Sequence, residues 1–312
     1  AGIIAKSPEV AVGGANAAGE ASLLQFLKFN RAQESAADLT GLKIMKKAGY
    51  SSEGLLSFLQ HLEAENRSFN DKSKSYLSTH PLSHERIDFI KTHAAKDSKG
   101  FSPKLLKDFF RVNAKIRAFT NDPRSVIKTA TDDSIEALYA KSIAYYRLGN
   151  VSKSLEIIDA LISREPKNAF FYEQKGQLLY ENNRINDAII AYKKAHELRP
   201  RDVNIKLSLA TALMSKNIES EKAISLLESV ALIESNNSFV WHQLSIAYHR
   251  KGDKIHGNIA LGWEAMLKGD KATAGKMVAI LKNEKSLDKK ALRRYEELKE
   301  AVSVMKDEDE QG

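Results

Sequence analysis

The sequence contains no cysteine, which excludes disulfide bonds and metal sites built from thiolates. It has only six prolines and is rich in Ala, Leu, Lys and Glu, which predicts an all-α protein. No apolar run is long enough to cross a membrane, so we expect no transmembrane segment. Residues 1–22 lack the basic start and continuous apolar core of a signal peptide, so we expect any targeting signal upstream of Ala1.

Charge of one sign is not concentrated in this chain, although its formal net charge is +8. Lys and Arg are scattered among Asp and Glu on the predicted helices, which favours solvated helix faces over a nucleic-acid-binding surface. No nucleic-acid-binding motif is present. Binding of duplex DNA through the basic surface is the weakest of three functional hypotheses, and we expect no nucleic-acid partner.

The first part of the chain is interpreted as one helical domain, residues 1–122. Gly49 follows an apolar-periodic segment and is placed to end its helix, and Ser83 is placed to cap a later one. We predict helices over residues 23–47, 54–66, 84–96 and 103–119.

The second part of the chain is a repeat. Pro166 and Pro200 lie 34 residues apart, and the segments that precede them align, with Ser142 over Gly176. A period of 34 with small residues at fixed positions is typical of tetratricopeptide (TPR) repeats. Small residues such as Gly176 and Ala188 would let two paired helices approach closely.

Two further copies begin near Val203 and Ser238, so we predict an α-solenoid of about four TPR units over residues 123–270. The last segment, 271–312, is interpreted as one or two capping helices and an acidic tail that is disordered from residue 306.

A TPR stack is a binding scaffold, and the first helix of each pair would line its groove. Each groove-facing residue taken alone is more simply a solvent-exposed helix residue. As a set, their aromatic and basic character suits extended peptide segments that are partly acidic or that end in a carboxylate. We predict the peptide-binding residues to be Tyr139, Tyr146, Arg147, Phe170, Glu173, Gln177, Tyr180, His242, His249 and Arg250.

Glu34 and Asp38 are four residues apart and share one helix face. Taken alone, they are most simply a partly exposed pair. Their helix, however, is apolar enough that we expect most of it to be buried, through Ala36, Ala37, Leu39, Leu42, Ile44 and Met45. Buried carboxylates need a cation or hydrogen-bond donors, and a divalent metal would meet that need.

His80 precedes Pro81, which pushes its backbone out of the helical region. Its side chain is therefore offered from an extended loop just before a helix. By itself it is most simply a loop histidine that bonds a backbone carbonyl.

The segments RAQESAAD, GLLSFLQHLE and YLSTHPLSHERI, in this order and followed by TPR repeats, resemble the TPR-bearing branch of the HtpX-like and CAAX-prenyl-protease-like zinc peptidases. The resemblance implies a periplasmic zinc metalloendopeptidase that acts in the quality control or assembly of outer-membrane proteins. It implies that residues 1–122 are the C-terminal portion of a helical, zincin-type metallopeptidase domain. It implies that Glu34 is a zinc ligand and that Asp38 and Arg86 support the ligands from the second shell. His80 would be a fourth or inhibitory ligand.

One part of the family pattern is missing, because H-E-x-x-H, which supplies two ligands and the general base, does not occur in this sequence. We expect this chain alone to hold zinc weakly and to be inactive, either as a truncated form or as a degenerate homologue. The alternative function is a non-enzymatic TPR adaptor or chaperone that binds peptide segments of protein partners, such as outer-membrane proteins and their assembly machinery.

Overall fold

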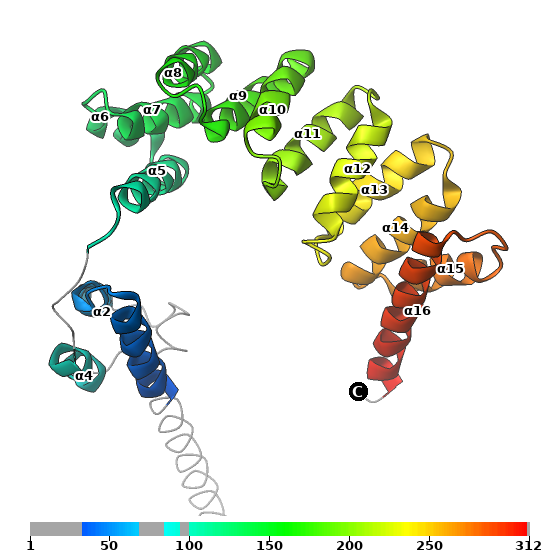
Figure 1. Cartoon of the computed structure of the whole chain (residues 1–312), viewed down its shortest axis with the longest axis horizontal. Coiled ribbons are helices and arrows are strands. Elements are labelled where there is room, and N and C mark those ends of the chain that lie inside the picture. The colour runs from blue at the N-terminus through cyan, green and yellow to red at the C-terminus, as the bar shows by residue number, and fades with distance from the viewer. Residues whose placement is uncertain (1–32, 69–83, 94–99, 311–312) are drawn as a thin grey trace, which may run out of the picture. The chain divides into compact units, whose positions relative to one another are not determined.

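The structure is a computed structural model that describes residues 33–68, 84–93 and 100–310 (Figure 1). Helix is the regular structure throughout these described ranges, which confirms the all-α prediction. None of the described helices combines the length and the apolar character that crossing a membrane requires. The chain divides into two compact units, unit 1 (residues 1–108) and unit 2 (residues 109–312).

Unit 1 is built from short helices around a small apolar centre. Gly49 has a φ of 79°, the left-handed conformation that ends the preceding helix as expected. The centre consists of four buried residues, Leu42, Leu59, Ile87 and Ile90. The helical segments are residues 33–48, α2 (Glu53–Ser68), α4 (His84–His93) and the start of α5 (Pro103–Thr120).

The expectation that the helix of residues 33–48 is mostly buried is wrong for the described structure. Leu42 is buried, but Leu39 is 37% and Ile44 is 61% exposed, and Ala36 and Ala37 are exposed too. The few described helices of unit 1 cover this helix along one stripe, the one that carries Asp38 and Leu42, and leave its other faces open.

Unit 2 is a stack of antiparallel helix pairs, in agreement with the predicted TPR solenoid (Figure 1). The pairs are α7 (Ile135–Arg147) with α8 (Val151–Arg164), α9 (Ala169–Glu181) with α10 (Ile185–Leu198), α11 (Val203–Ser215) with α12 (Ser220–Ala231), and α13 (Ser238–Arg250) with α14 (Lys254–Leu267). The stack is preceded by α6 (Pro123–Thr129) and followed by α15 (Lys271–Lys282) and α16 (Lys289–Glu310). The backbone of α16 continues to Glu310, within the segment for which the sequence predicts a disordered tail, and residues 311–312 lie outside the described residues.

Small residues at the crossing of each pair explain why the helices approach closely, as the sequence predicted. A Cβ atom on Gly176 would lie 2.6 Å from the ring of Tyr192 on the partner helix. In the preceding pair, Ser142 and Ser154 bond each other across the crossing, with the Ser154 hydroxyl 2.7 Å from the Ser142 carbonyl. The close approach of two paired helices is therefore made possible by a glycine in one pair and by two small serines, bonded to each other, in the other.

The C-terminal helix α16 fastens the end of the stack. Lys290 and Arg294 form ion pairs with Glu228 of α12, and Arg294 also lies over the Trp241 ring, 5.4 Å from its centroid. Leu298 is fully buried against α14 and α15. A terminal helix that covers the last apolar face is what a solenoid requires.

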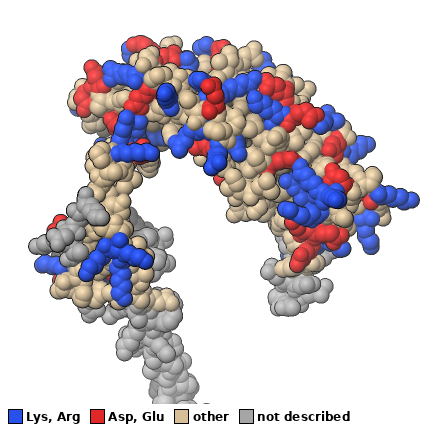
Figure 2. Space-filling view, viewed as in Figure 1, with Lys and Arg blue, Asp and Glu red and all other residues tan. Residues whose placement is uncertain are grey.

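Lys and Arg side chains are interspersed with Asp and Glu over the visible face of unit 2 (Figure 2). This distribution agrees with the interpretation of the net charge as solvated helix faces.

Candidate functional site

The first candidate site is a cluster of three charged residues in unit 1. Glu34 and Asp38 lie one helical turn apart, and Arg86 reaches them from the first turn of α4. The guanidinium donates from Nε to Asp38 Oδ2 at 2.8 Å and from Nη2 to Asp38 Oδ1 at 2.9 Å. Its Nη1 is 3.0 Å from Glu34 Oε2. One arginine therefore holds both carboxylates, and the contact to Asp38 is bidentate.

This cluster answers the question that two acidic residues on an apolar helix raised. Asp38 is 7% and Arg86 is 9% exposed, so the charges are largely removed from water. The cation that contacts Asp38 in the structure is the guanidinium of Arg86. Glu34 is held by the same guanidinium, so both carboxylates contact a hydrogen-bonding cation of the chain itself.

The described residues do not fit a complete zinc site. No group of three or more His, Cys, Asp or Glu residues suited to a metal occurs in the described part of the chain. His80 lies outside the described residues. A zinc peptidase needs three protein ligands, and Glu34 supplies one at most. The roles of Glu34, His80, Asp38 and Arg86 at a zinc ion remain predictions, and no catalytic step is assigned to this chain.

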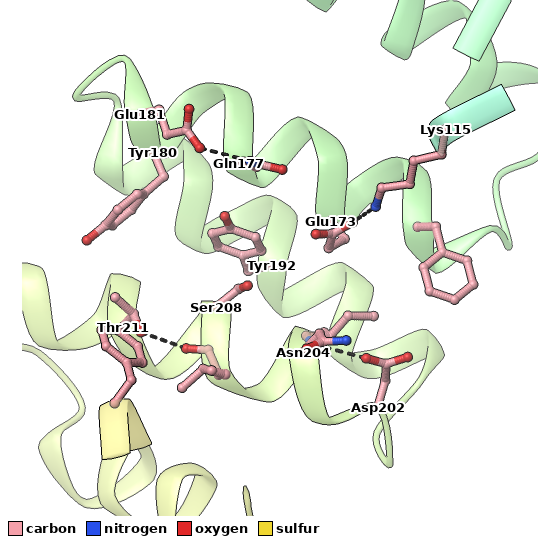
Figure 3. Close-up of a pocket in the computed structure, with 14 residues that line it drawn as sticks. Lys115, Glu173, Gln177, Tyr180, Glu181, Tyr192, Asp202, Asn204, Ser208 and Thr211 are labelled. Carbon is pink, nitrogen blue, oxygen red and sulfur yellow. Dashed lines mark hydrogen bonds and ion pairs between the residues drawn. The ribbon is translucent and has the colours of Figure 1, made fainter. Parts of the chain in front are cut away.

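The second candidate site is a pocket in unit 2, with a cavity of about 490 Å³ (Figure 3). Four of the ten predicted peptide-binding residues, Phe170, Glu173, Gln177 and Tyr180, come together here on one face of α9. The opposite wall comes from α11 and the start of α13. The other lining residues include Lys115, Glu181, Tyr192, Asp202, Asn204, Ser208, Thr211 and Phe239.

Acidic groups outnumber basic groups in this pocket. Glu173 pairs with Lys115 at 3.4 Å, and Asp202 accepts the Ile205 N–H as the N-cap of α11. Glu181 accepts a hydrogen bond from Gln177 at 2.9 Å, and no Lys or Arg of the described chain pairs with it. Burial by the pocket walls raises the pKa of Glu181 above its ordinary value.

The Tyr192 side chain lies in the same negatively charged surroundings. Its residue is 4% exposed, and it stands between Glu173, Glu181 and Ser208 in the pocket (Figure 3). Burial raises the pKa of Tyr192, and the nearby charges of Glu173 and Glu181 raise it further. The part of this shift that comes from Glu173 and Glu181 shows that the surroundings of the hydroxyl are negative, which favours a positive charge there over a negative one.

Three other predicted groove residues are engaged elsewhere. Tyr139 is 3% exposed and packs edge-to-face on Phe171, so its assignment to the groove surface is wrong. Arg147 donates to the Ala118 carbonyl of α5 at 2.8 Å, and Arg250 donates to the Met214 carbonyl of α11 at 2.9 Å. Both arginines therefore satisfy carbonyls at the end of a preceding helix, a role that depends on the neighbouring helix and cannot be read from one repeat.

Tyr146, His242 and His249 also lie outside the pocket. Tyr146 is half-buried against the core of the first pair. His242 bonds Glu264 of α14 at 2.9 Å, and the ring of His249 occupies the space above Gly257, where a Cβ atom would lie 2.6 Å away. The two histidines therefore join α13 to α14 within one repeat.

The pocket residues that the sequence analysis missed follow the repeat itself. Moving Phe170 and Gln177 forward by 34 positions gives Asn204 and Thr211, and both line the pocket. Phe239 occupies the corresponding position at the start of α13. Lys115 carried no such signal, because it comes from α5, ahead of the repeats.

These features define a class of protein, one in which a segment with a peptidase-type acidic helix precedes a TPR solenoid. Residues 7–94 match Peptidase family M48, and this range contains Glu34, Asp38, His80 and Arg86. The match covers less than a third of the chain, and the repeats follow it.

The particular proteins that the chain resembles are the beta-barrel assembly-enhancing proteases. It is 22% identical to that of Escherichia coli strain K12 over 233 residues, which are 71% of this chain and 46% of the relative. It is 20% identical to that of Yersinia pestis over 254 residues, 79% of this chain and 52% of the relative. The resemblance found in the sequence is thereby confirmed. The chain spans about half the length of these curated relatives.

Solved structures of MamA resemble the chain more loosely. MamA MSR-1 is 17% identical, with a TM-score of 0.45, and covers 53% of this chain and 98% of its own. Another MamA crystal structure is 17% identical, with a TM-score of 0.44, and covers 58% of this chain and 97% of its own. Both TM-scores are below 0.5.

Proposed function

We propose that this chain carries one zinc ligand and the substrate-holding repeats of a periplasmic zinc metalloendopeptidase. The enzyme would act in the assembly or quality control of outer-membrane proteins. In this proposal Glu34 is the ligand from this chain, and the TPR stack holds protein substrates or the assembly machinery. The remaining zinc ligands and the general base would come from an H-E-x-x-H helix that the 312 residues do not contain.

The observation that supports this proposal most is the buried cluster of Glu34, Asp38 and Arg86 within the segment that matches Peptidase family M48. A ligand carboxylate must be held in a fixed orientation, and residues that bond it from behind provide that. Arg86 contacts Glu34 and is itself fixed by two hydrogen bonds to Asp38. A carboxylate oriented in this way is a ligand type that zinc accepts.

Zinc content and casein cleavage test the proposal when this chain is measured beside the same reading frame extended upstream. We expect this chain to be inactive and the extended form to bind zinc and cleave casein. In the extended form Glu34→Gln should reduce both zinc content and cleavage, whereas Glu53→Gln, at an exposed acid at the start of α2, should reduce neither. An extended frame without H-E-x-x-H, or full activity of E34Q, would overturn the proposal.

The pocket in unit 2 favours a second candidate function, that of a non-enzymatic adaptor or chaperone. This function needs no metal. The test is the aggregation of an unfolded outer-membrane β-barrel protein, followed by light scattering with and without this chain in the presence of a chelator. A chaperone should slow aggregation under these conditions, and an unchanged rate would exclude this role.

A further inference from the structure

The pocket of unit 2 differs in charge from the groove that the sequence suggested. The basic residues expected there, Arg147 and Arg250, are bonded to backbone carbonyls elsewhere. The residues that do line the cavity include Glu173, Glu181 and Asp202, with Lys115 as the basic member among the lining residues. The preference for acidic or carboxylate-ending peptides therefore has no support in the described groove.

We propose that this pocket binds an extended polypeptide segment through a lysine or arginine side chain flanked by apolar residues. This inference rests on the protein-binding role proposed for the repeats and names the chemistry of the segment. The cationic end group would lie among Glu173, Glu181 and the Tyr192 hydroxyl, and the flanking side chains would lie against Phe170 and Phe239.

The three carboxylates of the pocket differ in the partners that they already have. Glu173 is 16% exposed in its side chain and has only the long 3.4 Å contact to Lys115. Asp202 is committed to capping α11. Glu181 is bonded by the neutral amide of Gln177 and has no cationic partner in the described chain, so an incoming cation would relieve the cost of its partial burial.

The walls suit the rest of the segment. Phe170 is 39% and Phe239 is 46% exposed, and they stand at corresponding positions at the starts of α9 and α13. The guanidinium of Arg199 already lies 4.8 Å from the Phe170 ring centroid, so this wall accepts a basic side chain within the chain itself. A cavity of about 490 Å³ has room for long side chains and not only for a backbone.

Fluorescence anisotropy with three labelled peptides tests the inference on the full 312-residue chain. The first peptide has lysines spaced among leucine and phenylalanine residues, and in the other two every lysine is replaced by glutamine or by glutamate. We expect the lysine peptide to bind most tightly, with an affinity that falls as salt is added. The glutamate peptide should bind least tightly.

Two substitutions that each remove one negative charge at nearly constant shape test whether the pocket carboxylates cause the preference for lysine. Glu181→Gln and Glu173→Gln should each weaken binding of the lysine peptide by roughly threefold to fivefold and leave the glutamine peptide unchanged. Glu156→Gln, the same change at an exposed glutamate of α8 outside the pocket, should alter neither affinity. Phe239→Ala, which removes a wall instead of a charge, should weaken all three peptides, and circular dichroism checks that each variant is folded.

The outcomes separate this inference from the role on which it rests. Equal binding of the three peptides, tighter binding of the glutamate peptide, or a preference for lysine that persists in the double variant E173Q/E181Q would overturn the basic-segment inference. Each of these results would leave a protein-binding stack in place. No binding of any peptide would remove the protein-binding role itself, while the zinc test on Glu34 would stand independently.

Discussion

The two units of this chain hold themselves together by different means. Unit 2 buries apolar side chains from every helix pair, and one cluster alone joins residues from α9 to α14. Unit 1 has four buried apolar residues in its described part, beside a buried cluster of three charges. A solenoid obtains its core from neighbouring repeats, so it is nearly self-sufficient. The described part of unit 1 is not, because so small a core offsets little conformational entropy.

The largest expected effect is a difference in thermal unfolding between the two units when they are prepared as separate fragments. We expect residues 103–312 to unfold in one cooperative thermal transition, because their helix pairs and the packed face of α5 remain intact. Residues 1–102 should lose ellipticity gradually with temperature, because the four apolar residues buried in the described part of this fragment do not sustain a cooperative core. Circular dichroism of the two fragments checks this. A sharp transition in residues 1–102 would show that the contrast between the units is wrong.

Removing the guanidinium should disturb unit 1 alone. Arg86→Met removes the guanidinium that is bonded to the buried Asp38, and breaking a buried ion pair on one side typically costs about 3 to 5 kcal/mol. We therefore expect amide hydrogens of residues 33–48 and of α4 to exchange rapidly in the variant, with the repeats unchanged. Arg293→Met removes an arginine that is 73% exposed and should change neither region. Unaltered exchange in unit 1 would mean that the cluster is not structural.

A single methyl group should test the close packing of unit 2. Gly176→Ala places a Cβ atom 2.6 Å from the Tyr192 ring, and the ring is too enclosed to move freely, so we expect a loss of about 1 to 3 kcal/mol. Gly275→Ala on α15 meets nothing within 4 Å and should stabilise its helix by about 0.5 to 1 kcal/mol. Chemical denaturation of both variants measures the difference. Equal effects would mean that the helices do not cross as closely as described.

The fold of unit 2 could be predicted from sequence because its determinants are local and repeated. The sequence itself shows the 34-residue period, the helix-ending turns and the small residues Ser142, Gly176 and Ala188. Unit 1 offered no period, so the exposure of Leu39 and Ile44 could not be anticipated. Burial there depends on how many helices surround residues 33–48, and that is a tertiary property.

The two candidate sites could likewise be predicted only where a single helix carries the residues. Glu34 and Asp38 could be recognised as a pair, but their bonds to Arg86 join residues about fifty positions apart in sequence. Phe170, Glu173, Gln177 and Tyr180 were placed together because a single helix face carries them. The burial of Tyr139 against Phe171 and the bond from Arg147 to Ala118 could not be predicted, because a neighbouring helix rather than their own provides each contact.

The smallest expected effect is a change in the acid sensitivity of unit 2, through two glutamates near its C-terminal end, Glu228 and Glu264. Burial alone would raise the pKa of Glu228 and of Glu264. Hydrogen bonds from Lys290 and Tyr248 to Glu228, and from Lys268 and His242 to Glu264, outweigh burial and hold each pKa below the ordinary 4.5. A carboxyl group with a lowered pKa in the folded state contributes stability that is fully present above its unfolded pKa.

That contribution is lost as the pH falls through the lowered values. We therefore expect the thermal midpoint of unit 2 to decline below pH 4.5, and the double variant E228Q/E264Q should start from a lower midpoint and decline less steeply. Exposed Glu156→Gln serves as the matched control and should keep the full slope. If the double variant declined as steeply as the parent, the acid sensitivity would belong to other carboxylates, and α16 would be held by its apolar face alone.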